Sequence, residues 1–260
     1  MNKLSKVDLH HILSRTPRDV RDLLKANKLF LAGGFIRAII AGEKPSDIDL
    51  LGPDKTALEM YAVNLANSRS GRVHKTDNAL TVLSSPKLPI QFITRWRYDE
   101  EETLIKQFDF TIVQAAIWYE LVGEPPAPGG KWQGEWKSIC SDDFYPDLAA
   151  RRLVYTNPVR AEDAGGSMLR VIKYIKRGYN IQVPSLAAVS ARFVAGLRLS
   201  NNFDVADGQG NFSTITVDGV QRINEAWATP NLMALLREVD PLAFVDGIEM
   251  VDELSKDGVP

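Results

Sequence analysis

The sequence predicts an α+β fold, in which a mixed sheet with flanking helices precedes a mainly helical C-terminal region. Short strand-like segments alternate with amphipathic helical segments over residues 1–120, and helical patterns dominate after Tyr145. The segment EPPAPGG at 124–130 lies between them, and its prolines and glycines are typical of a loop at a domain boundary. We therefore expect two domains, at 1–125 and 126–260.

The individual elements follow from local signals. Thr16-Pro17 predicts a helix start because proline suits the first helical position, and Gly42 predicts a helix end. In the first domain we expect helices at 17–27, 35–41 and 56–67, a helical turn at 100–107, and strands at 29–32, 46–51, 72–74, 79–83, 90–93 and 108–118. In the second we expect a further hairpin at 131–139 and helices at 167–177, 185–199, 220–228 and 231–239.

The composition is that of an ordinary globular protein, with 260 residues, 45% apolar residues and a net charge of −2. The overall charge therefore does not indicate a general nucleic-acid binder. The charge is uneven, however. Residues 151–177 carry seven bases against two acids, a net charge of +5, whereas residues 201–260 carry eleven acids against three bases, a net charge of −8. A polyanionic ligand would favour the first of these segments and avoid the second.

The single cysteine, Cys140, excludes an intrachain disulfide and a cysteine-based metal site, so we expect a small buried thiol. The N-terminal segment has no apolar stretch of the kind found in secretion signals. No run of about 18 apolar residues is present, so we expect no membrane span. The expected location is the cytoplasm of a bacterium or of a phage-infected cell.

Asp47 and Asp49 form a D-x-D pair within a predicted strand. Residues two apart on a strand point to the same face, so the two carboxylates would lie roughly 7 Å apart. Two like charges at this spacing repel each other unless a cation binds them, and carboxylate oxygens suit Mg²⁺ or Mn²⁺. Two such metals can activate an attacking hydroxyl and stabilise a leaving pyrophosphate. A third carboxylate commonly completes such a site, and Asp109 is the candidate for it. An isolated D-x-D pair also occurs at solvated strand ends, where it binds no metal.

Gly33-Gly34 lies after a predicted strand and before a short predicted helix that carries Arg37. Glycines at this position let backbone N–H groups approach phosphate closely, and a helix start favours an anion. Arg37, one turn into the helix, could pair with a phosphate oxygen. The segment is not a P-loop, because Gly42 is followed by Glu43-Lys44-Pro45, and it is not the G-x-G-x-x-G dinucleotide fingerprint.

Taken in order, these features resemble the head domain shared by CCA-adding enzymes and bacterial poly(A) polymerases, of the polymerase-β-like nucleotidyltransferase superfamily. The pattern of that family is L-x-G-G-x-x-R-D followed by a glycine and then D-x-D. The positions that match it are Leu31, Gly33, Gly34, Arg37, Gly42, Asp47 and Asp49. The later segment FDFTIVQAA at 108–116 resembles the R-D-F-T-I-N-A block of the family.

The resemblance implies that Asp47 and Asp49 bind the catalytic metal, and that Gly33, Gly34 and Arg37 hold the incoming triphosphate. It also implies that the block around Asp109 helps to recognise the ribose. Whether Asp109 contacts the metal or the sugar therefore stays open at this point.

A third segment, NPVRAEDAGGSMLRVIKYIKRGY at 157–179, resembles the region that follows the head in the same family. Arg170, Lys173 and Arg177 fall on one face of its predicted helix. These side chains could contact a triphosphate, a base or an RNA backbone, or they could form a solvated helix face.

The sequence departs from the family pattern at several points. Ala38 replaces the aspartate that follows the arginine, and Gln107-Phe108 replaces a basic pair. Glu162-Asp163 is not followed by the x-x-R of the base-reading motif E-D-x-x-R, and about 130 residues follow the head, too few for the tRNA-gripping domains of the family. We therefore expect a shorter, phage-type relative.

The leading hypothesis is a Mg²⁺-dependent transfer of a nucleoside monophosphate from an NTP to a hydroxyl, with an RNA or tRNA 3′ end as the first choice of acceptor. A second hypothesis keeps the chemistry and changes the acceptor to a protein or a small molecule. A third is an inactive module that binds a nucleotide or nucleic acid.

Overall fold

The computed structural model describes residues 1–122, 133–158, 164–196 and 214–237. The chain divides into two compact units, Met1–Pro158 and Val159–Pro260.

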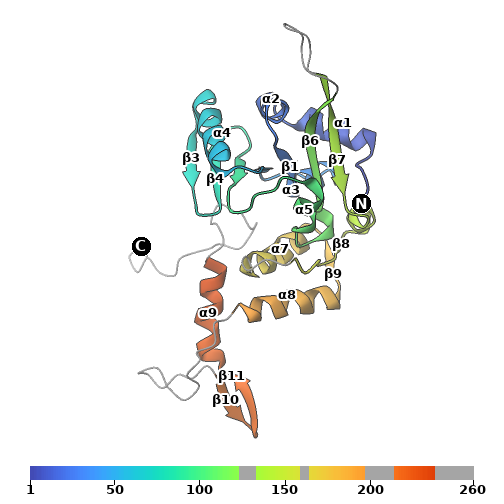
Figure 1. Ribbon diagram of the computed structural model, residues 1–260. Helices are drawn as coiled ribbons and strands as arrows, with labels where there is room; N and C mark the ends of the chain where they lie inside the picture. The colour runs from blue at the N-terminus through green and yellow to red at the C-terminus, as the bar shows by residue number, and fades with distance from the viewer. Residues whose placement is uncertain (123–132, 159–163, 197–213, 238–260) are drawn as a thin grey trace, which may run out of the picture. The chain divides into compact units, whose positions relative to one another are not determined.

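A seven-stranded sheet with the strand order β3-β4-β5-β2-β1-β6-β7 forms the centre of the first unit (Figure 1). Its strands are β1 (Phe30–Ala32), β2 (Ile48–Leu51), β3 (Arg72–Lys75), β4 (Ala79–Leu83), β5 (Ile90–Ile93), β6 (Ala115–Val122) and β7 (Gln133–Cys140). The β2–β5 pair is parallel and the other neighbouring pairs of this sheet are antiparallel. The expected mixed sheet, and with it the α+β class, is confirmed.

Helices flank this sheet. They are α1 (Lys6–Arg15), α2 (Arg18–Ala26), α3 (Gly34–Ile40), α4 (Lys55–Ser68), α5 (Glu101–Lys106), the 3-10 turn η1 (Thr111–Val113) and α6 (Phe144–Ala149), and a short strand β8 (Arg152–Leu153) follows. α4 packs against β3, β4 and β5, whereas α5 packs against β6 and β7. Four of these elements, α2, α3, α4 and α5, were predicted from the sequence to within one residue at each end, whereas α1, η1, α6 and β8 were not predicted.

Alternation along β2 sorts its side chains between the two faces of the sheet. Ile48 and Leu50 are fully buried on one face, and Asp49 and Leu51 lie on the other. We call the second of these the Asp49 face.

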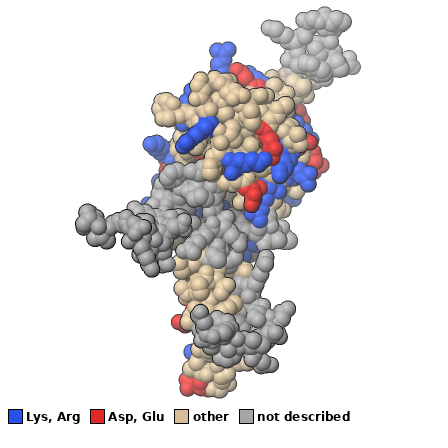
Figure 2. Space-filling view, turned by 90° about the vertical axis from the view of Figure 1, so that its left-hand side faces the viewer, with Lys and Arg blue, Asp and Glu red and all other residues tan. Residues whose placement is uncertain are grey.

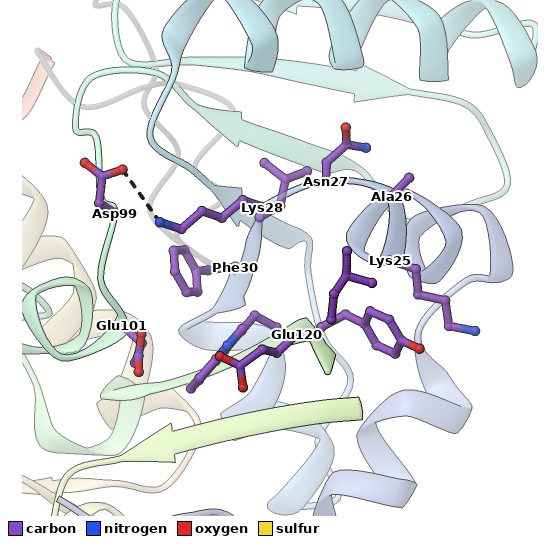
Figure 3. A pocket seen from close by; sticks show the side chains of 12 residues that line it. Lys25, Ala26, Asn27, Lys28, Phe30, Asp99, Glu101 and Glu120 are labelled. Carbon is purple, nitrogen blue, oxygen red and sulfur yellow. Dashed lines mark ion pairs between the residues drawn. The ribbon is translucent and has the colours of Figure 1, made fainter. Parts of the chain in front are cut away.

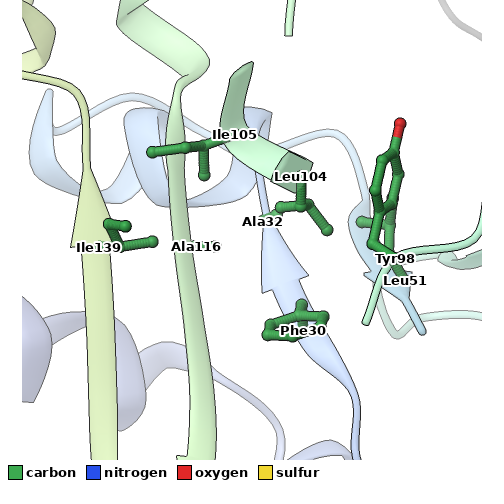
Figure 4. Packing of buried hydrophobic residues seen from close by; sticks show 8 residues of the cluster. All are labelled: Phe30, Ala32, Leu51, Tyr98, Leu104, Ile105, Ala116 and Ile139. Atoms are coloured by element: carbon green, nitrogen blue, oxygen red, sulfur yellow. The ribbon is translucent and has the colours of Figure 1, made fainter. Parts of the chain in front are cut away.

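The Asp49 face carries a hydrophobic cluster at the centre of the sheet. Figure 4 shows Leu104 and Ile105 of α5 over Ala32 of β1 and Ala116 of β6. The cluster members are Phe30, Ala32, Leu51, Tyr98, Leu104, Ile105, Ala116 and Ile139. Asp49 therefore lies on a face that is apolar at β1, β6 and β7.

One expected element is different in the structure. Residues 108–118 were predicted as one strand, but β6 begins only at Ala115, and a bend with the turn η1 precedes it. The reason is that the backbone of 108–111 bonds elsewhere: the carbonyl of Asp109 accepts from the Thr156 N–H at 2.9 Å, and the Thr111 N–H donates to the Val154 carbonyl at 3.1 Å. This segment is thus held by the chain that follows α6 and not by the sheet.

The domain boundary expected after residue 125 falls between two strands that belong together. β6 and β7 pair in register from Ala115↔Cys140 to Val122↔Gln133, which makes the hairpin one continuous part of the sheet. The first compact unit therefore includes β7 and α6 and ends at Pro158.

The second unit is mainly helical. It contains α7 (Ala164–Lys176), β9 (Asn180–Ile181), α8 (Val183–Ala195), β10 (Thr214–Val217), β11 (Val220–Ile223) and α9 (Glu225–Arg237), and α7 packs against both α8 and α9. The helix expected at 220–228 is wrong at its start, because Val220–Ile223 pairs with β10 as a hairpin. Asp218 and Gly219 both have positive φ, and Asp-Gly is a strong sequence signal for this kind of turn.

The state of Cys140 and the lengths of the helices bear on two further expectations. Cys140 is a buried, free thiol as predicted, and burial raises its pKa to about 11. Within the described ranges, no helix combines the length and the apolar character that crossing a membrane requires.

We predict that Leu104→Ala destabilises the first unit by about 2–5 kcal/mol, because it removes a side chain that is 1% exposed from the cluster on the Asp49 face. Urea unfolding would measure the change. Leu121→Ala is the control: this side chain is 50% exposed, so its loss should change stability by less than about 1 kcal/mol. Equal losses in both variants would contradict the packing described here.

A second prediction concerns pH. The Arg69 guanidinium at the end of α4 is buried and bonds both carboxylate oxygens of Asp19 on α2, at 2.7 and 2.8 Å. The hydrogen bond from Arg69 lowers the pKa of Asp19 below its ordinary value of 3.8. The pair thus adds stability that is complete above pH 3.8 and is lost as the pH falls through the lower pKa of the folded state.

Asp19→Asn should therefore destabilise the protein at pH 7, and the difference from the unsubstituted protein should shrink below about pH 4. Urea midpoints at pH 7 and pH 3 test this. Asp22→Asn, which removes an exposed partner of Arg18, should behave like the unsubstituted protein at both pH values. A deficit of Asp19→Asn that is independent of pH would contradict the role of the charge.

Candidate functional site

Asp47 and Asp49 lie at the start of β2, next to the end of β1. Register places Asp49 directly opposite Ala32, the residue before the glycine turn. Both aspartates are half-buried, and the Ser46 hydroxyl donates to Oδ1 of Asp47 at 3.0 Å. Asp49 therefore stands on the face of the sheet next to the glycine turn, and Asp47 precedes the strand by one residue, with both carboxylates partly accessible.

Gly33 forms the turn between β1 and α3 with φ 76° and ψ −131°, a conformation that is essentially restricted to glycine. A Cβ atom built on Gly33 would lie 3.0 Å from Cε1 of Phe108 and 3.9 Å from Oδ2 of Asp49. The turn, the Phe108 ring and the Asp49 carboxylate are thus packed together. The sequence presented Phe108 as a departure from the basic pair of the family, and the structure places its ring against the glycine turn.

The two glycines differ in what their backbones offer. The Gly33 N–H donates to the Ala115 carbonyl at 3.0 Å and so completes the β1–β6 pairing. A Cβ on Gly34 would meet nothing within 4 Å, so the space beside Gly34 is open. Of the two residues expected to cradle phosphate, Gly34 is the one whose N–H does not already bond within the sheet.

Arg37 points into the protein. Its side chain is 1% exposed, and Nη1 bonds Oε2 of Glu43 at 2.5 Å. Glu43 also lies 3.8 Å from Nη1 of Arg151. Arg37 therefore ties α3 to the loop that leads to Asp47. The role of Glu43 was not predicted from the sequence. Glu43 lies in a loop, where no helical or strand periodicity indicates which side chains meet.

The Asp109 block lies beside the turn and is held by a buried polar cluster. Asp109 is 2% exposed, and the Phe108 carbonyl accepts from the Thr156 hydroxyl at 2.6 Å. Two residues further on, the Thr111 hydroxyl donates to Oδ2 of Asp147 at 2.5 Å, and Arg152 donates to Oδ1 of the same carboxylate at 2.7 Å. Asp147 is 1% exposed, and no local pattern in the sequence indicates its role.

The remaining predicted residues, Arg170 and Lys173, belong to α7 in the second unit, where both side chains are half-buried. Glu162-Asp163, which departed from the base-reading motif, lies outside the described residues.

The donor set at the start of β2 suits a hard divalent cation. Two partly accessible carboxylates lie two residues apart in the chain, with the Ser46 hydroxyl hydrogen-bonded to that of Asp47. In the part of the chain that the structure describes, no group of three or more His, Cys, Asp or Glu side chains is close enough to share an ion. Asp109 does not join Asp47 and Asp49 in such a group.

A pocket of about 420 Å³ lies at the opposite end of β1, where that strand starts. It is lined by Phe30, Trp118 and Tyr119 and by Lys25, Lys28 and Glu101, and Figure 3 shows the Lys28–Asp99 ion pair among its side chains. None of the residues predicted for nucleotide or metal chemistry lines this pocket.

We predict that Gly33→Ala destabilises the first unit by about 1–3 kcal/mol, because alanine at this φ is strained and its Cβ meets the Phe108 ring. Adding Phe108→Ala should remove the steric part of the destabilisation caused by Gly33→Ala and leave the backbone part. Thermal unfolding of the double-mutant cycle would separate the two. Gly34→Ala, which has open space, should be neutral or stabilising, and a loss as large as that of Gly33→Ala would contradict the geometry.

Comparison with solved structures supports the fold. The chain is similar to the Thermotoga maritima CCA-adding enzyme in complex with tRNA, with 18% identity and a TM-score of 0.50 over 74% of this chain and 46% of that one. This match confirms the expected resemblance to the polymerase-β-like nucleotidyltransferase head at the level of the fold. The chain also matches a CCA-adding enzyme in complex with ATP, with 17% identity and a TM-score of 0.49 over 74% of this chain and 45% of that one. It thus spans about half the length of these enzymes.

No curated protein sequence matches the chain. A family model described as "Gad2: Gabija anti-defense 2 family protein" matches residues 3–151, a range that includes β1, the glycine turn, the aspartate pair and the Asp109 block. Because this match covers more than half of the sequence, the chain belongs to the Gabija anti-defense 2 family.

Proposed function

We propose that the chain is a metal-dependent nucleotidyltransferase that moves a nucleoside monophosphate from an NTP to a hydroxyl and releases pyrophosphate. One observation carries this proposal: the β1–β2 register brings Asp49, one carboxylate of the D-x-D pair, beside the glycine turn at Gly33. The likeness to nucleotidyltransferases in fold is consistent with it.

In this proposal Asp47 and Asp49 hold Mg²⁺ or Mn²⁺. Such a cation, when bound, would neutralise the triphosphate and stabilise the charge that develops on the leaving pyrophosphate. The residues themselves supply placement. Gly34, with open space beside it, lets the triphosphate approach the backbone, and Gly33 keeps that turn against Asp49.

We assign supporting roles to the buried residues. Arg37 was expected to pair with phosphate, but it is buried and bonded to Glu43, so we propose that it positions the loop before Asp47. Asp109 is buried in a block held by Thr156 and by the Asp147 cluster, which suits a contact to the ribose better than a place among the metal ligands. We retain Arg170 and Lys173 of α7 as proposed contacts for a nucleotide or a nucleic-acid phosphate.

The bond changes are those of a simple substitution at phosphorus. The acceptor oxygen bonds to the α-phosphorus, and the bond from that phosphorus to the bridging oxygen of the β-phosphate breaks. Pyrophosphate leaves with the electron pair, and the proton of the acceptor hydroxyl passes to water. The acceptor we favour is an RNA 3′ end.

A second acceptor class is favoured by the family description. A protein named for action against a defence system could transfer the nucleotide to a hydroxyl of a protein of that system. Figure 2 shows Lys and Arg mixed with Asp and Glu on the face it presents, without a field of one sign, and this surface suits a protein as well as a nucleic acid. In either case we propose that nucleotide transfer is how the chain opposes the Gabija system.

The test is to incubate the protein with Mg²⁺ and each α-labelled NTP, together with RNA or with a lysate of cells that carry the Gabija system. We expect pyrophosphate release and incorporated label, and we expect Asp47→Ala and Asp49→Ala to reduce both by at least about 100-fold, because each removes a metal ligand. Asp99→Ala is the matched control, since Asp99 is 77% exposed and pairs only loosely with Lys28.

The position of the label decides between the acceptors: label in RNA supports the first choice, and label in a protein band supports the second. Binding of NTP and Mg²⁺ without turnover would instead indicate an inactive binding module, a hypothesis motivated by the missing acid at Ala38 and the missing basic pair at Gln107-Phe108. Incorporation that is equal in Asp47→Ala and in the unsubstituted protein would show that the assignment is wrong.

A further inference from the structure

One row of side chains crosses all seven strands on the Asp49 face. The register pairs are His74↔Thr81, Thr81↔Gln91, Gln91↔Asp49, Asp49↔Ala32, Ala32↔Ala116 and Ala116↔Ile139. From Asp49 towards β7 the row is apolar and belongs to the hydrophobic cluster. From Asp49 towards β3 it is polar throughout, with Gln91, Thr81 and His74.

Gln91 is the direct neighbour of Asp49 on the next strand. Paired strands lie about 4.8 Å apart, so the Gln91 amide is within reach of a group bound at the Asp49 carboxylate. Gln91 is half-buried, and its side chain makes no hydrogen bond to any described residue. An amide can both donate to and accept from a hydroxyl, but it does not act as a base.

Thr81 provides an independent observation. It is 1% exposed, and among the described residues its Oγ1 atom has no hydrogen-bond partner. A buried hydroxyl without a partner costs free energy that a methyl group of the same shape would not. Thr81 lies opposite Gln91, where cross-strand side chains come close enough to bond. Its hydroxyl is therefore available to the Gln91 amide when that amide turns towards a ligand.

The in-line geometry of phosphoryl transfer indicates which ligand the Gln91 amide contacts. Attacking and leaving oxygens lie roughly in line in phosphoryl transfer. The glycine turn, which would adjoin the triphosphate, is on the β1 side of Asp49, so the leaving pyrophosphate lies on that side. The attacking hydroxyl must then approach from the β5 side, where Gln91 and Thr81 lie.

We infer that Gln91 binds the hydroxyl of the acceptor and that Thr81 positions the Gln91 amide for this contact. Gln91 accepts a hydrogen bond from the attacking hydroxyl and orients it, and the proton of that hydroxyl leaves to water because an amide cannot take it. This inference rests on the proposed nucleotidyl transfer and adds an acceptor subsite to it.

The outer end of the row indicates the class of acceptor. β3 presents Arg72 and His74 to the Asp49 face, and both side chains are exposed. Arg72 takes part in no ion pair with another described residue. A cation about three strands from the carboxylates suits the backbone phosphate of a chain whose terminal hydroxyl reaches Gln91. The subsite therefore fits an RNA 3′ end.

The experiment uses the full chain with Mg²⁺, NTP and a short labelled single-stranded RNA that has a free 3′ hydroxyl. For Gln91→Ala we expect the KM for RNA to rise about three- to tenfold, because one hydrogen bond to the acceptor is lost. The KM for NTP should stay unchanged. For Arg72→Gln we expect a higher KM for RNA and a salt dependence of RNA binding that is weaker by about one phosphate contact. Gln221→Ala on the exposed strand β11 and Arg18→Gln, which changes an exposed side chain of α2, are the matched controls.

Thr81→Val gives a signature that a structural role would not give. Removing a buried hydroxyl without a partner should leave Tm unchanged or raise it, whereas the KM for RNA should rise about threefold. A fall in Tm together with an unchanged KM for RNA would overturn the role of Thr81.

Fluorescence anisotropy with the same RNA, in the Asp47→Ala background, measures acceptor binding without turnover. Weaker binding in Gln91→Ala and Arg72→Gln, with normal binding in both controls, supports the subsite. If pyrophosphate is released and label enters a protein but not RNA, the RNA subsite is wrong while nucleotidyl transfer stands. If the unsubstituted protein releases no pyrophosphate with any NTP and does not bind the RNA, the acceptor subsite and the proposed nucleotidyl transfer are both wrong.

Discussion

The pairing of β1 with β2 is the constraint on which the candidate site depends. A strand of three residues ends at Ala32, and its partner places Asp49 directly across from it. Any shift by one residue would turn Asp49 to the opposite face of the sheet and Leu50 to the site. The burial of Ile48 and Leu50 against one face determines that register, so the hydrophobic core and the placement of the carboxylates are specified together.

Much of this could be predicted because it follows from periods and spacing. The alternation of SDIDLL predicts that Ile48 and Leu50 are buried on one face and that Asp49 lies on the other, and the strand–glycine–helix order predicts where the turn lies. What could not be predicted depends on contacts between segments distant in sequence. Asp147 holds Thr111 from 36 positions away, and nothing local to either residue indicates it. The 108–114 segment was expected to be a strand because of its apolar composition, which does not show that its backbone bonds to residues after α6. The Asp-Gly pair at 218–219, by contrast, is a sequence signal for a hairpin, but a helix was predicted directly after it.

The ion pair of Arg37 with Glu43 changes the role expected for this arginine. A guanidinium buried to the extent of Arg37 is stable only with a close partner, and Glu43 supplies it from the loop before Asp47. The arginine that matches the family pattern therefore supports the shape of the site from within. The polar half of the cross-sheet row, next to Asp49, instead carries neutral groups, Gln91 and Thr81, which can orient a hydroxyl without competing with the aspartates for a cation.

The contact between Gly33 and the Phe108 ring has a consequence for how this sequence can change over time. The ring occupies the space that a side chain at position 33 would need, and it lies beside the Asp49 carboxylate. Position 33 can therefore not gain a side chain while the ring at position 108 is in place, so each of the two positions limits which residue the other can accept.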